Sequence, residues 1–270
     1  MTAIGRVLII AGSDSGGGAG IQADIKTVTA LGGYAATAIT AVTVQNTLGV
    51  SAAYPVAPEV VVAQARAVME DIGADVIKVG MLGDVEIVEA VVGILDTWAR
   101  PAVIDPVMVA KGGARLLADE AVAPVKRLLV PRAALLTPNA PEAEALTGLA
   151  VETTDDLRRA GEALLRQGAG AVLMKGGHIA GERVTDILMT PYGETLFEGE
   201  RIDTRHTHGT GCTLASACAT GLAQQMSLEA AAARAWDYVH RAMLQAPGFG
   251  AGNGPLDHGW PLRDRDRGKA

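Results

Sequence analysis

The residues best suited to chemistry lie in one short segment, residues 208–213, which reads His-Gly-Thr-Gly-Cys-Thr. Gly209 and Gly211, with only Thr210 between them, let the backbone turn sharply and bring its N–H groups close to a ligand. A helical pattern follows, and the N–H groups at a helix start have no intrahelical partners and suit an anion such as phosphate. Cys212 falls in the first turn, where this field favours thiolate over thiol. The alternative interpretation is a glycine-rich helix start with a small cysteine in the core.

Polar residues also follow the first two expected strands. A glycine-rich loop, residues 12–20, comes directly after a short apolar run and leads to Asp24, an acid among small and apolar neighbours. The loop matches neither the P-loop nor the dinucleotide-binding pattern. Gln45 follows the next strand and places an amide there. Taken singly, each of these polar groups could be satisfied locally.

Three later strand ends repeat the arrangement. Asp105 places a carboxylate at one of them, and Asn139 and Glu142 offer two oxygen ligands three residues apart. That spacing suits Mg²⁺, which needs few protein oxygens because water and substrate phosphates complete its shell. The alternative for this pair is helix capping with an acid in the first turn. Lys175, followed by two glycines, suits a phosphate, although a lysine at a strand end is otherwise usually a solvated charge.

These residues need elements to position them, and short β-rich runs alternate with helical patterns along the chain. The alternation predicts an α/β fold with a mostly parallel sheet covered by helices on both faces. Ligands then bind beyond the carboxyl ends of the strands, where the polar residues fall. Strands are expected at residues 7–11, 35–43, 76–79, 102–105, 133–136 and 171–175, with an extended piece at 50–54 and a hairpin at 183–190 and 194–201. Helices are expected at residues 21–31, 59–72, 85–98, 120–129, 154–167, 212–225 and 228–244.

Length, composition and net charge limit the classes of function that this chain can have. With 270 residues and 49% hydrophobic content, the chain can bury a large core, and we expect one domain at residues 1–262 followed by a charged, frayed tail at 263–270. A net charge of −7 offers no footprint for nucleic acid or an anionic membrane, so neither partner is expected. Cys212 and Cys218 fit neither a disulfide scaffold nor a zinc site. No signal-peptide layout or bilayer-spanning run is present, which predicts a cytoplasmic protein.

Taken together, these motifs resemble the ribokinase-like kinases, which share an Asn-x-x-Glu segment and a late Gly-Thr-Gly before a helix. Within that superfamily the chain is similar to the bacterial hydroxymethylpyrimidine/phosphomethylpyrimidine kinases of thiamine biosynthesis. The resemblance extends over nearly the whole chain, from residue 6 to about residue 258. It is carried by residues 12–24, 44–47, 105–111, 137–142, 175–178, 208–214 and 254–258.

The resemblance implies a three-layer α/β/α fold. The implied reaction transfers the γ-phosphate of ATP, with Mg²⁺, to the hydroxymethyl oxygen of the pyrimidine. The same enzyme is then expected to phosphorylate the monophosphate to the diphosphate. The resemblance also implies a homodimer. Asp24 and Gln45 are expected to hold the aminopyrimidine ring, and Asn139 and Glu142 to position Mg²⁺. Lys175 and the 209–212 backbone are expected to balance charge on the phosphoryl group. The other site residues implied are Gly12, Met81 and Val107 for the substrate, and Asp105, Asn139, Lys175 and His208, which also orients the loop, for the nucleotide.

The role of Cys212 stays open at this point. Most sugar kinases of the superfamily carry an aspartate base at the matching position, so a thiolate could take the alcohol proton. Phosphoryl transfer depends mainly on positioning and charge neutralisation, so Cys212 could equally position the loop. Two other functions compete: a pyridoxal or pyridoxine kinase of the same fold, against which Gln45 argues, and a catalytically silent ligand-binding protein.

Overall fold

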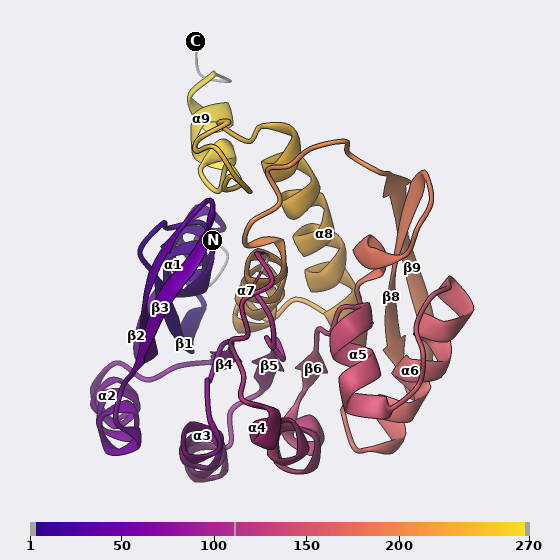
Figure 1. The fold of residues 1–270 in the computed structure, drawn as a ribbon. Helices are drawn as coiled ribbons and strands as arrows, with labels where there is room; N and C mark the ends of the chain where they lie inside the picture. The colour runs from indigo at the N-terminus through magenta and orange to yellow at the C-terminus, as the bar shows by residue number, and fades with distance from the viewer. Residues whose placement is uncertain (1–3, 111, 268–270) are drawn as a thin grey trace.

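One mixed sheet organises the molecule (Figure 1), a computed structural model that describes residues 4–110 and 112–267. The strand order is β3-β2-β1-β4-β5-β6-β7-β8-β9. From β2 to β7 neighbouring strands are parallel, whereas β3 and the β8–β9 hairpin are antiparallel additions at the two edges. The strands are β1 (Arg6–Asp14), β2 (Tyr34–Asn46), β3 (Gly49–Pro55), β4 (Val76–Val79), β5 (Ala102–Ile104), β6 (Leu135–Leu136), β7 (Val172–Met174), β8 (Arg183–Thr190) and β9 (Gly193–Glu200).

Helices cover both faces of the sheet, which confirms the predicted three-layer α/β/α architecture. On one face lie α2 (Pro58–Asp71), α3 (Val85–Trp98), α4 (Asp119–Pro124), α5 (Ala140–Thr147) and α6 (Thr154–Arg166). On the other lie α1 (Gly20–Ala30), α7 (Thr210–Ala223) and α8 (Leu228–Leu244), with α9 (Trp260–Arg267) beside α1. In the described residues no helix is both long and apolar enough to cross a bilayer.

Strand β1 shows why the layers form. Successive side chains of a strand point to opposite faces, so an unbroken apolar run is buried only when helices cover both faces. Leu8 and Ile10 belong to one hydrophobic core and Val7 and Ile9 to the other, all with at most 1% of their surface exposed. Together the two cores are large, as expected, and are built mainly from aliphatic rather than aromatic side chains.

Helix α7 lies against the middle of the sheet and is made mainly of small residues. Ten of its 14 residues are buried, among them Ala215, Ala217 and Cys218. Such small side chains let α7 pack closely against the sheet on one side and α8 on the other. The helix start is thereby fixed close to the carboxyl ends of β1, β4 and β5.

Several expected boundaries differ from the structure. The helix expected at residues 120–129 is α4 followed by a π-helical turn (Val125–Leu129) and a 3-10 turn (Val130–Arg132), because Pro124 lies inside it and cannot donate a helical hydrogen bond. The second strand continues to Asn46, so Gln45 lies on β2 rather than after it.

Part of the C-terminal tail is helical. Residues 263–267 extend α9, whereas the sequence predicted a frayed end; residues 268–270 lie outside the described residues, as does Lys111 of the 105–111 motif. The start of α9 is held by Trp260, whose indole N–H donates to the carbonyl of Tyr238 at 3.2 Å. The Arg263 guanidinium also pairs with Asp257. These contacts place the helix start against α8.

Candidate active site

A cavity of about 550 Å³ opens at the carboxyl ends of β1, β4 and β5 and at the end of β2. The predicted site residues line it, with one exception, so the strand-end motifs meet at one rim. The exception is Asp24. The predicted residues that line the cavity are Gly12, Gln45, Met81, Asp105, Val107, Asn139, Glu142, Lys175, His208, Gly209, Thr210, Gly211 and Cys212.

The start of α7 forms one wall of this cavity. Gly209 is the N-cap residue and has a φ of 86°, a left-handed conformation that favours glycine. A Cβ at Gly209 would lie 1.8 Å from the carbonyl oxygen of Gly18, so the two loops meet at backbone contact. In the described part of the chain, the N–H groups of Gly211 and Cys212 have no backbone acceptor. As predicted, the site therefore presents free N–H groups at a helix start, which suit an anion.

Lys175 supplies the cation beside this helix start. Its Nζ lies 3.0 Å from Asp105 Oδ1 and 3.7 Å from Glu142 Oε2. A Cβ at Gly211 would lie 3.1 Å from the Lys175 Nζ, so the ammonium almost touches the α7 backbone. Burial lowers the pKa of Lys175, but the Asp105 and Glu142 carboxylates outweigh it, and the net shift is upward. Lys175 is therefore a permanent positive charge.

Glu142 is the titratable carboxyl of the cluster. Burial raises its pKa to about 7; Lys175 opposes the shift, and Asp105 adds to it. The Asp105 carboxylate, 2% exposed, also accepts from Thr137 Oγ1 at 3.2 Å. One lysine thus faces two carboxyl groups, and the charge of Glu142 changes near neutral pH.

Asn139 and Glu142 form a capping box at the start of α5. Asn139 Oδ1 accepts from the Glu142 N–H at 2.9 Å, and Glu142 Oε2 accepts from the Asn139 N–H at 2.8 Å. The helix-capping alternative from the sequence thus describes both hydrogen bonds. Glu142 Oε1 makes no hydrogen bond within the described residues, and Asn139 Oδ1 keeps a second lone pair beyond the bond it accepts from the Glu142 N–H.

The thiol of Cys212 does not have the thiolate character that the sequence suggested. Burial raises its pKa to about 12; Lys78 and the Gly20 N–H oppose the shift, and Asp24 and Asp105 add to it. Burial and the neighbouring carboxylates outweigh the field at the start of α7, which by itself favours the thiolate. At neutral pH Cys212 therefore lines the cavity as a neutral thiol.

The expectation for Asp24 is corrected by its position. Its side chain is fully buried behind the cavity wall, and Lys78 Nζ donates to both carboxylate oxygens, at 3.0 and 2.9 Å. Ser216 Oγ also donates to Asp24 Oδ1, at 2.6 Å. A carboxylate engaged by these two groups and closed off from the cavity is not placed to grip a ring. Its partner Lys78 lies on β4, three residues before Met81.

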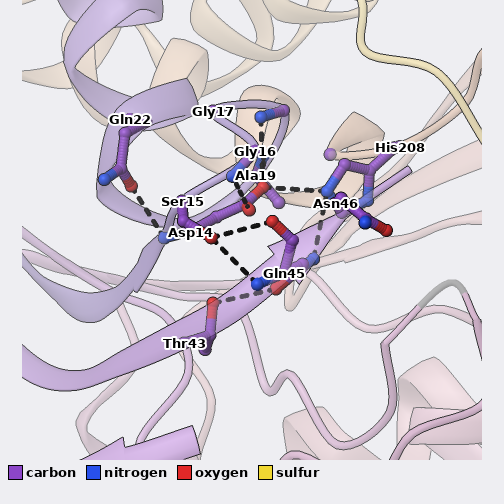
Figure 2. Close-up of polar contacts among 12 residues, drawn as sticks. Asp14, Ser15, Gly16, Gly17, Ala19, Gln22, Thr43, Gln45, Asn46 and His208 are labelled. Atoms are coloured by element: carbon purple, nitrogen blue, oxygen red, sulfur yellow. Dashed lines mark hydrogen bonds and ion pairs between the residues drawn. The ribbon is translucent and has the colours of Figure 1, made fainter. Parts of the chain in front are cut away.

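A second acid, Asp14, takes a place at the rim that the sequence analysis did not assign (Figure 2). At the end of β1 its carboxylate accepts from the N–H groups of Gly16, Gly18 and Ala19, at 2.8, 3.1 and 2.8 Å. His208 Nε2 lies 2.9 Å from Asp14 Oδ2. Burial disfavours ionisation of Asp14, but these hydrogen bonds outweigh it and hold its pKa below the usual value. An acid inside a glycine-rich loop was the available signal.

His208 also touches the predicted ring-binding amide. Its Nε2 lies 3.1 Å from Gln45 Nε2, and Gln45 Oε1 lies 3.2 Å from Thr43 Oγ1. Figure 2 shows the Gln45 side chain between Thr43 and His208. The sequence analysis placed His208 at the nucleotide, whereas here it lies between the glycine-rich loop and Gln45. Thr43, 4% exposed on β2, was not singled out from the sequence.

A second cavity, of about 1130 Å³, lies between β8, β9, α7 and α8. Its inner wall includes the apolar side chains of Leu214, Val239 and Met243, and its outer wall includes Arg183 and Arg201. The two cavities meet where they share lining residues. These shared residues are Asn139, Lys175, His178, Thr207, Thr210 and Gly211.

Comparison with known proteins identifies the family of this chain. Residues 14–257 match the model of the phosphomethylpyrimidine kinase family. The hydroxymethylpyrimidine/phosphomethylpyrimidine kinase of Streptomyces coelicolor is 49% identical, over 95% of each chain. The phosphomethylpyrimidine kinase structure of Clostridium difficile is 40% identical, with a TM-score of 0.79 over 88% of this chain and 99% of that one.

A solved structure with a different named activity is similar as well. An ADP complex of the pyridoxal kinase of Bacillus subtilis is 34% identical, with a TM-score of 0.89 over 97% of this chain and 99% of that one. Fold and backbone thus resemble both kinds of kinase, whereas sequence identity is higher to the pyrimidine kinases. The match of the family model over most of the chain, together with this site, shows that the protein belongs to the phosphomethylpyrimidine kinase family.

Proposed function

We propose that this protein transfers the γ-phosphate of ATP to the hydroxymethyl oxygen of hydroxymethylpyrimidine, and then phosphorylates the monophosphate to the diphosphate, for thiamine biosynthesis. The observation that carries the proposal is the meeting of two cavities at Lys175 and the start of α7. A reaction between two bound substrates needs the transferred group to lie between them, beside positive charge and free N–H groups. Lys175 and Gly211 provide both at that junction.

The smaller cavity suits the pyrimidine. Gln45 offers an amide donor and acceptor at its wall, and Met81 and Val107 offer apolar surface for the ring faces. The hydroxymethyl group would point toward Cys212 and Gly211. The larger cavity suits the nucleotide, since Leu214, Val239 and Met243 can contact a base while Arg183 and Arg201 lie nearby. The family resemblance supports ATP as the phosphate donor.

In the proposed step, the hydroxymethyl oxygen bonds to the γ-phosphorus while the bond from that phosphorus to the bridging oxygen breaks and ADP leaves. Lys175 and the free N–H groups of α7 stabilise the negative charge on the moving phosphoryl group. The alcohol proton is lost late, because little proton transfer has occurred in a loose transition state. A neutral Cys212 thiol is compatible with this order, since no strong base is needed early.

The residues present fit a magnesium ion, which we propose as part of the active complex. Within the described residues Glu142 Oε1 accepts no hydrogen bond, and Glu142 Oε2 lies 3.7 Å from the Nζ of Lys175, which lines both cavities. In the described residues no group of three or more His, Cys, Asp or Glu side chains could hold a metal alone. Water and nucleotide phosphates would therefore complete the shell, which is the usual mode for Mg²⁺. Such an ion would neutralise phosphate charge.

The proposal also covers the oligomeric state, cellular location and partners of the enzyme. Family resemblance supports a homodimer in the cytoplasm, acting on a small-molecule substrate without nucleic acid or membrane. Size-exclusion chromatography with light scattering measures the oligomeric state directly, and a monomer at micromolar concentration would contradict the dimer.

The activity is tested by ADP release from the purified protein with ATP and one of three acceptors: hydroxymethylpyrimidine, its monophosphate or pyridoxal. We expect both pyrimidines to release ADP well above the acceptor-free rate, and pyridoxal to be used less well. A pyridine ring lacks the amine edge, and each unpaired buried polar group costs about 1–3 kcal/mol. Gln45→Met should reduce pyrimidine use selectively. Equal or better use of pyridoxal would favour the vitamin B6 kinase, and no release with any acceptor would favour a silent binding protein.

A further inference from the structure

The hydrogen atoms around His208 can be assigned from its partners. Asp14 is ionised and can only accept, and its Oδ2 lies 2.9 Å from His208 Nε2. A bare ring nitrogen would face the carboxylate with a lone pair, which is repulsive, so Nε2 must carry a hydrogen that it donates to Asp14. That nitrogen then has no lone pair left for another donor. The group of Gln45 that lies 3.1 Å from it must therefore be an acceptor, which shares the one Nε2 hydrogen with Asp14.

The Thr43 hydroxyl constrains the Gln45 amide from its other side. The Thr43 hydroxyl lies 2.9 Å from the carbonyl oxygen of Ser13, which can only accept, so its one hydrogen is donated there. The Thr43 oxygen can then only accept from the Gln45 atom at 3.2 Å. That atom must be the amide nitrogen. Because the nitrogen and oxygen of an amide are told apart by their partners, His208 and Thr43 independently select one orientation.

We propose that Asp14, through His208, and Thr43 fix the Gln45 amide with Oε1 toward His208 and Nε2 toward Thr43, and thereby select the donor–acceptor order of the substrate ring. This inference rests on the proposed function, in which Gln45 contacts the ring. The two neighbours use one lone pair of Oε1 and one hydrogen of Nε2. One lone pair and one N–H remain at the cavity wall for a ligand.

The fixed amide gives the ring a defined polarity. An aminopyrimidine can donate an amino hydrogen to Oε1 and accept from Nε2 at the adjacent ring nitrogen, so Gln45 alone reads both positions. This also removes the need for Asp24 at the ring. The 4-oxo analogue presents the reverse order, with an acceptor at position 4 and an N–H at the adjacent ring nitrogen. The 4-oxo analogue can form both hydrogen bonds only if the Gln45 amide flips, so that Nε2 faces His208 and Oε1 faces Thr43.

The test compares hydroxymethylpyrimidine with its 4-oxo analogue in the wild type and in His208→Phe, which keeps a flat ring but removes the N–H. We measure kcat/KM by ADP release and Kd by calorimetry, and take the ratio of the two ligands. Two mismatched hydrogen bonds should make wild type prefer the 4-amino ring by at least about a hundredfold. In His208→Phe only Thr43 still selects the orientation, so the amide turns over more easily, and we expect this ratio to fall at least tenfold, partly through better use of the 4-oxo ring.

Thr43→Val provides a second variant if His208→Phe does not fold, and it should lower the ratio in the same direction. The matched control is His258→Phe, another buried histidine, whose Nε2 lies 3.0 Å from Thr213 Oγ1 near the start of α7. General damage to the helix start should reduce use of both ligands alike and leave the ratio unchanged.

The outcomes separate this inference from the proposed function. An unchanged ratio in both His208→Phe and Thr43→Val, or a wild type that binds both rings equally or neither, overturns the fixed amide. Selective binding of the 4-amino ring by calorimetry, without any ADP release, would keep the fixed amide and overturn the kinase activity.

Discussion

At the scale of single residues, Glu142 is the group whose charge the site controls. Burial raises its pKa from 4.5 to about 7, while its Oε2 accepts from the Asn139 N–H and faces Lys175. A carboxylate that must be charged to help hold a cation would then be half protonated near pH 7. The activity of this kinase should therefore depend on pH near neutrality, and a variant without this carboxyl separates that dependence from the titration of the substrate phosphates.

We predict that Glu142→Gln lowers kcat roughly 10- to 1000-fold, the range typical for a lost charge at a phosphoryl-transfer site. Glutamine retains an oxygen for the capping box, so α5 should keep its start. In wild type, kcat/KM should rise as pH increases through about 7, and the variant should lack that step. Steady-state rates from pH 5.5 to 8.5 at saturating Mg²⁺ measure this. A variant with wild-type turnover and the same pH step would remove Glu142 from the site.

The same pKa has a consequence for stability. Because the folded-state pKa of Glu142 lies above 4.5, the folded protein binds this proton more tightly than the unfolded chain. Its contribution is fully present below pH 4.5 and is lost as pH rises to about 7. We expect the unfolding free energy of wild type, relative to Glu142→Gln, to fall by on the order of 2 kcal/mol from pH 4.5 to 7.5. Urea titrations at these pH values measure it, and a difference that is independent of pH would contradict the raised pKa.

Cys212 provides a contrasting prediction. If a thiolate were the base, Cys212→Ser would lose about 10²–10⁴-fold in rate. Since burial holds the thiol neutral with a pKa of about 12, we expect less than roughly tenfold loss, because positioning and charge carry the step. Unliganded wild type should also react slowly with iodoacetamide at pH 7.5. Rapid alkylation together with a thousandfold loss in the serine variant would restore the thiolate base.

The sequence predicted which residues reach the cavity better than it predicted which side chains pair with one another. Lys175, Glu142 and the Gly-Thr-Gly-Cys segment reached the cavity because their positions after strands determine the edge at which they lie. Asp24 lies on α1 and not at a strand end, so this rule does not apply to it. Whether its carboxylate faces a ligand or a buried lysine depends on Lys78, which is 54 residues away, and local sequence does not specify that contact.

At the scale of elements, the start of α7 and the glycine-rich loop after β1 act as one unit. Gly209 contacts the Gly18 backbone, and a Cβ at Gly209 would lie 1.8 Å from the Gly18 carbonyl oxygen. The pattern of two glycines predicted a sharp turn there. It did not predict that the turn abuts a loop nearly 200 residues away, because backbone contact between distant segments leaves no local signal in the sequence.

We predict that Gly209→Ala lowers the unfolding free energy by more than about 3 kcal/mol or displaces the loop, since a left-handed alanine adds strain to the steric clash. The matched control is Gly148→Ala. Gly148 ends α5 with a φ of 77°, and a Cβ there would meet nothing within 4 Å. That variant should cost only about 1 kcal/mol, the cost of a left-handed alanine alone. Urea unfolding of both proteins gives the comparison, and equal costs would contradict a close approach of the two loops.

The mostly parallel sheet and most element types followed from alternation, whereas the strand order and details near proline and at the edges did not. The run at residues 120–129 has helical spacing, yet Pro124 divides it into α4 and a π-helical turn. Helix α5 was hidden because its eight residues give little periodicity, and only its capping box marks it. Short elements depend on tertiary contacts more than on their own pattern.

At the scale of the whole molecule, one buried ion pair joins three elements. Asp24 on α1 accepts from Lys78 on β4 and from Ser216 on α7, and both charged side chains are fully buried. Burial lowers the pKa of Lys78, but the carboxylates of Asp24 and Asp105 outweigh it, so the lysine stays charged. The pair therefore links the sheet to the helical layer that carries the start of α7. We expect the pair to stabilise the wall of the cavity by linking these elements.

Breaking the pair on one side should be costly, because it leaves a buried charge without a partner. We predict that Lys78→Met lowers the unfolding free energy by about 3–5 kcal/mol. In the double variant with Asp24→Asn, the amide still accepts from Ser216 and no charge is left buried. The double variant should therefore be more stable than Lys78→Met alone, and urea unfolding of the four proteins in the cycle measures the coupling. Additive losses would contradict a coupled pair.

The double variant also tests where Asp24 acts. If the pair only supports the wall, Asp24→Asn with Lys78→Met should keep the KM for hydroxymethylpyrimidine within about threefold of wild type, since distant structural changes cost little at a preserved contact. Gln45→Met, which alters the cavity itself, should raise that KM far more. A double variant that folds stably yet loses pyrimidine affinity as severely as Gln45→Met would return Asp24 to the ring. The stable fold matters to this argument, because it separates a lost ring contact from a collapsed wall.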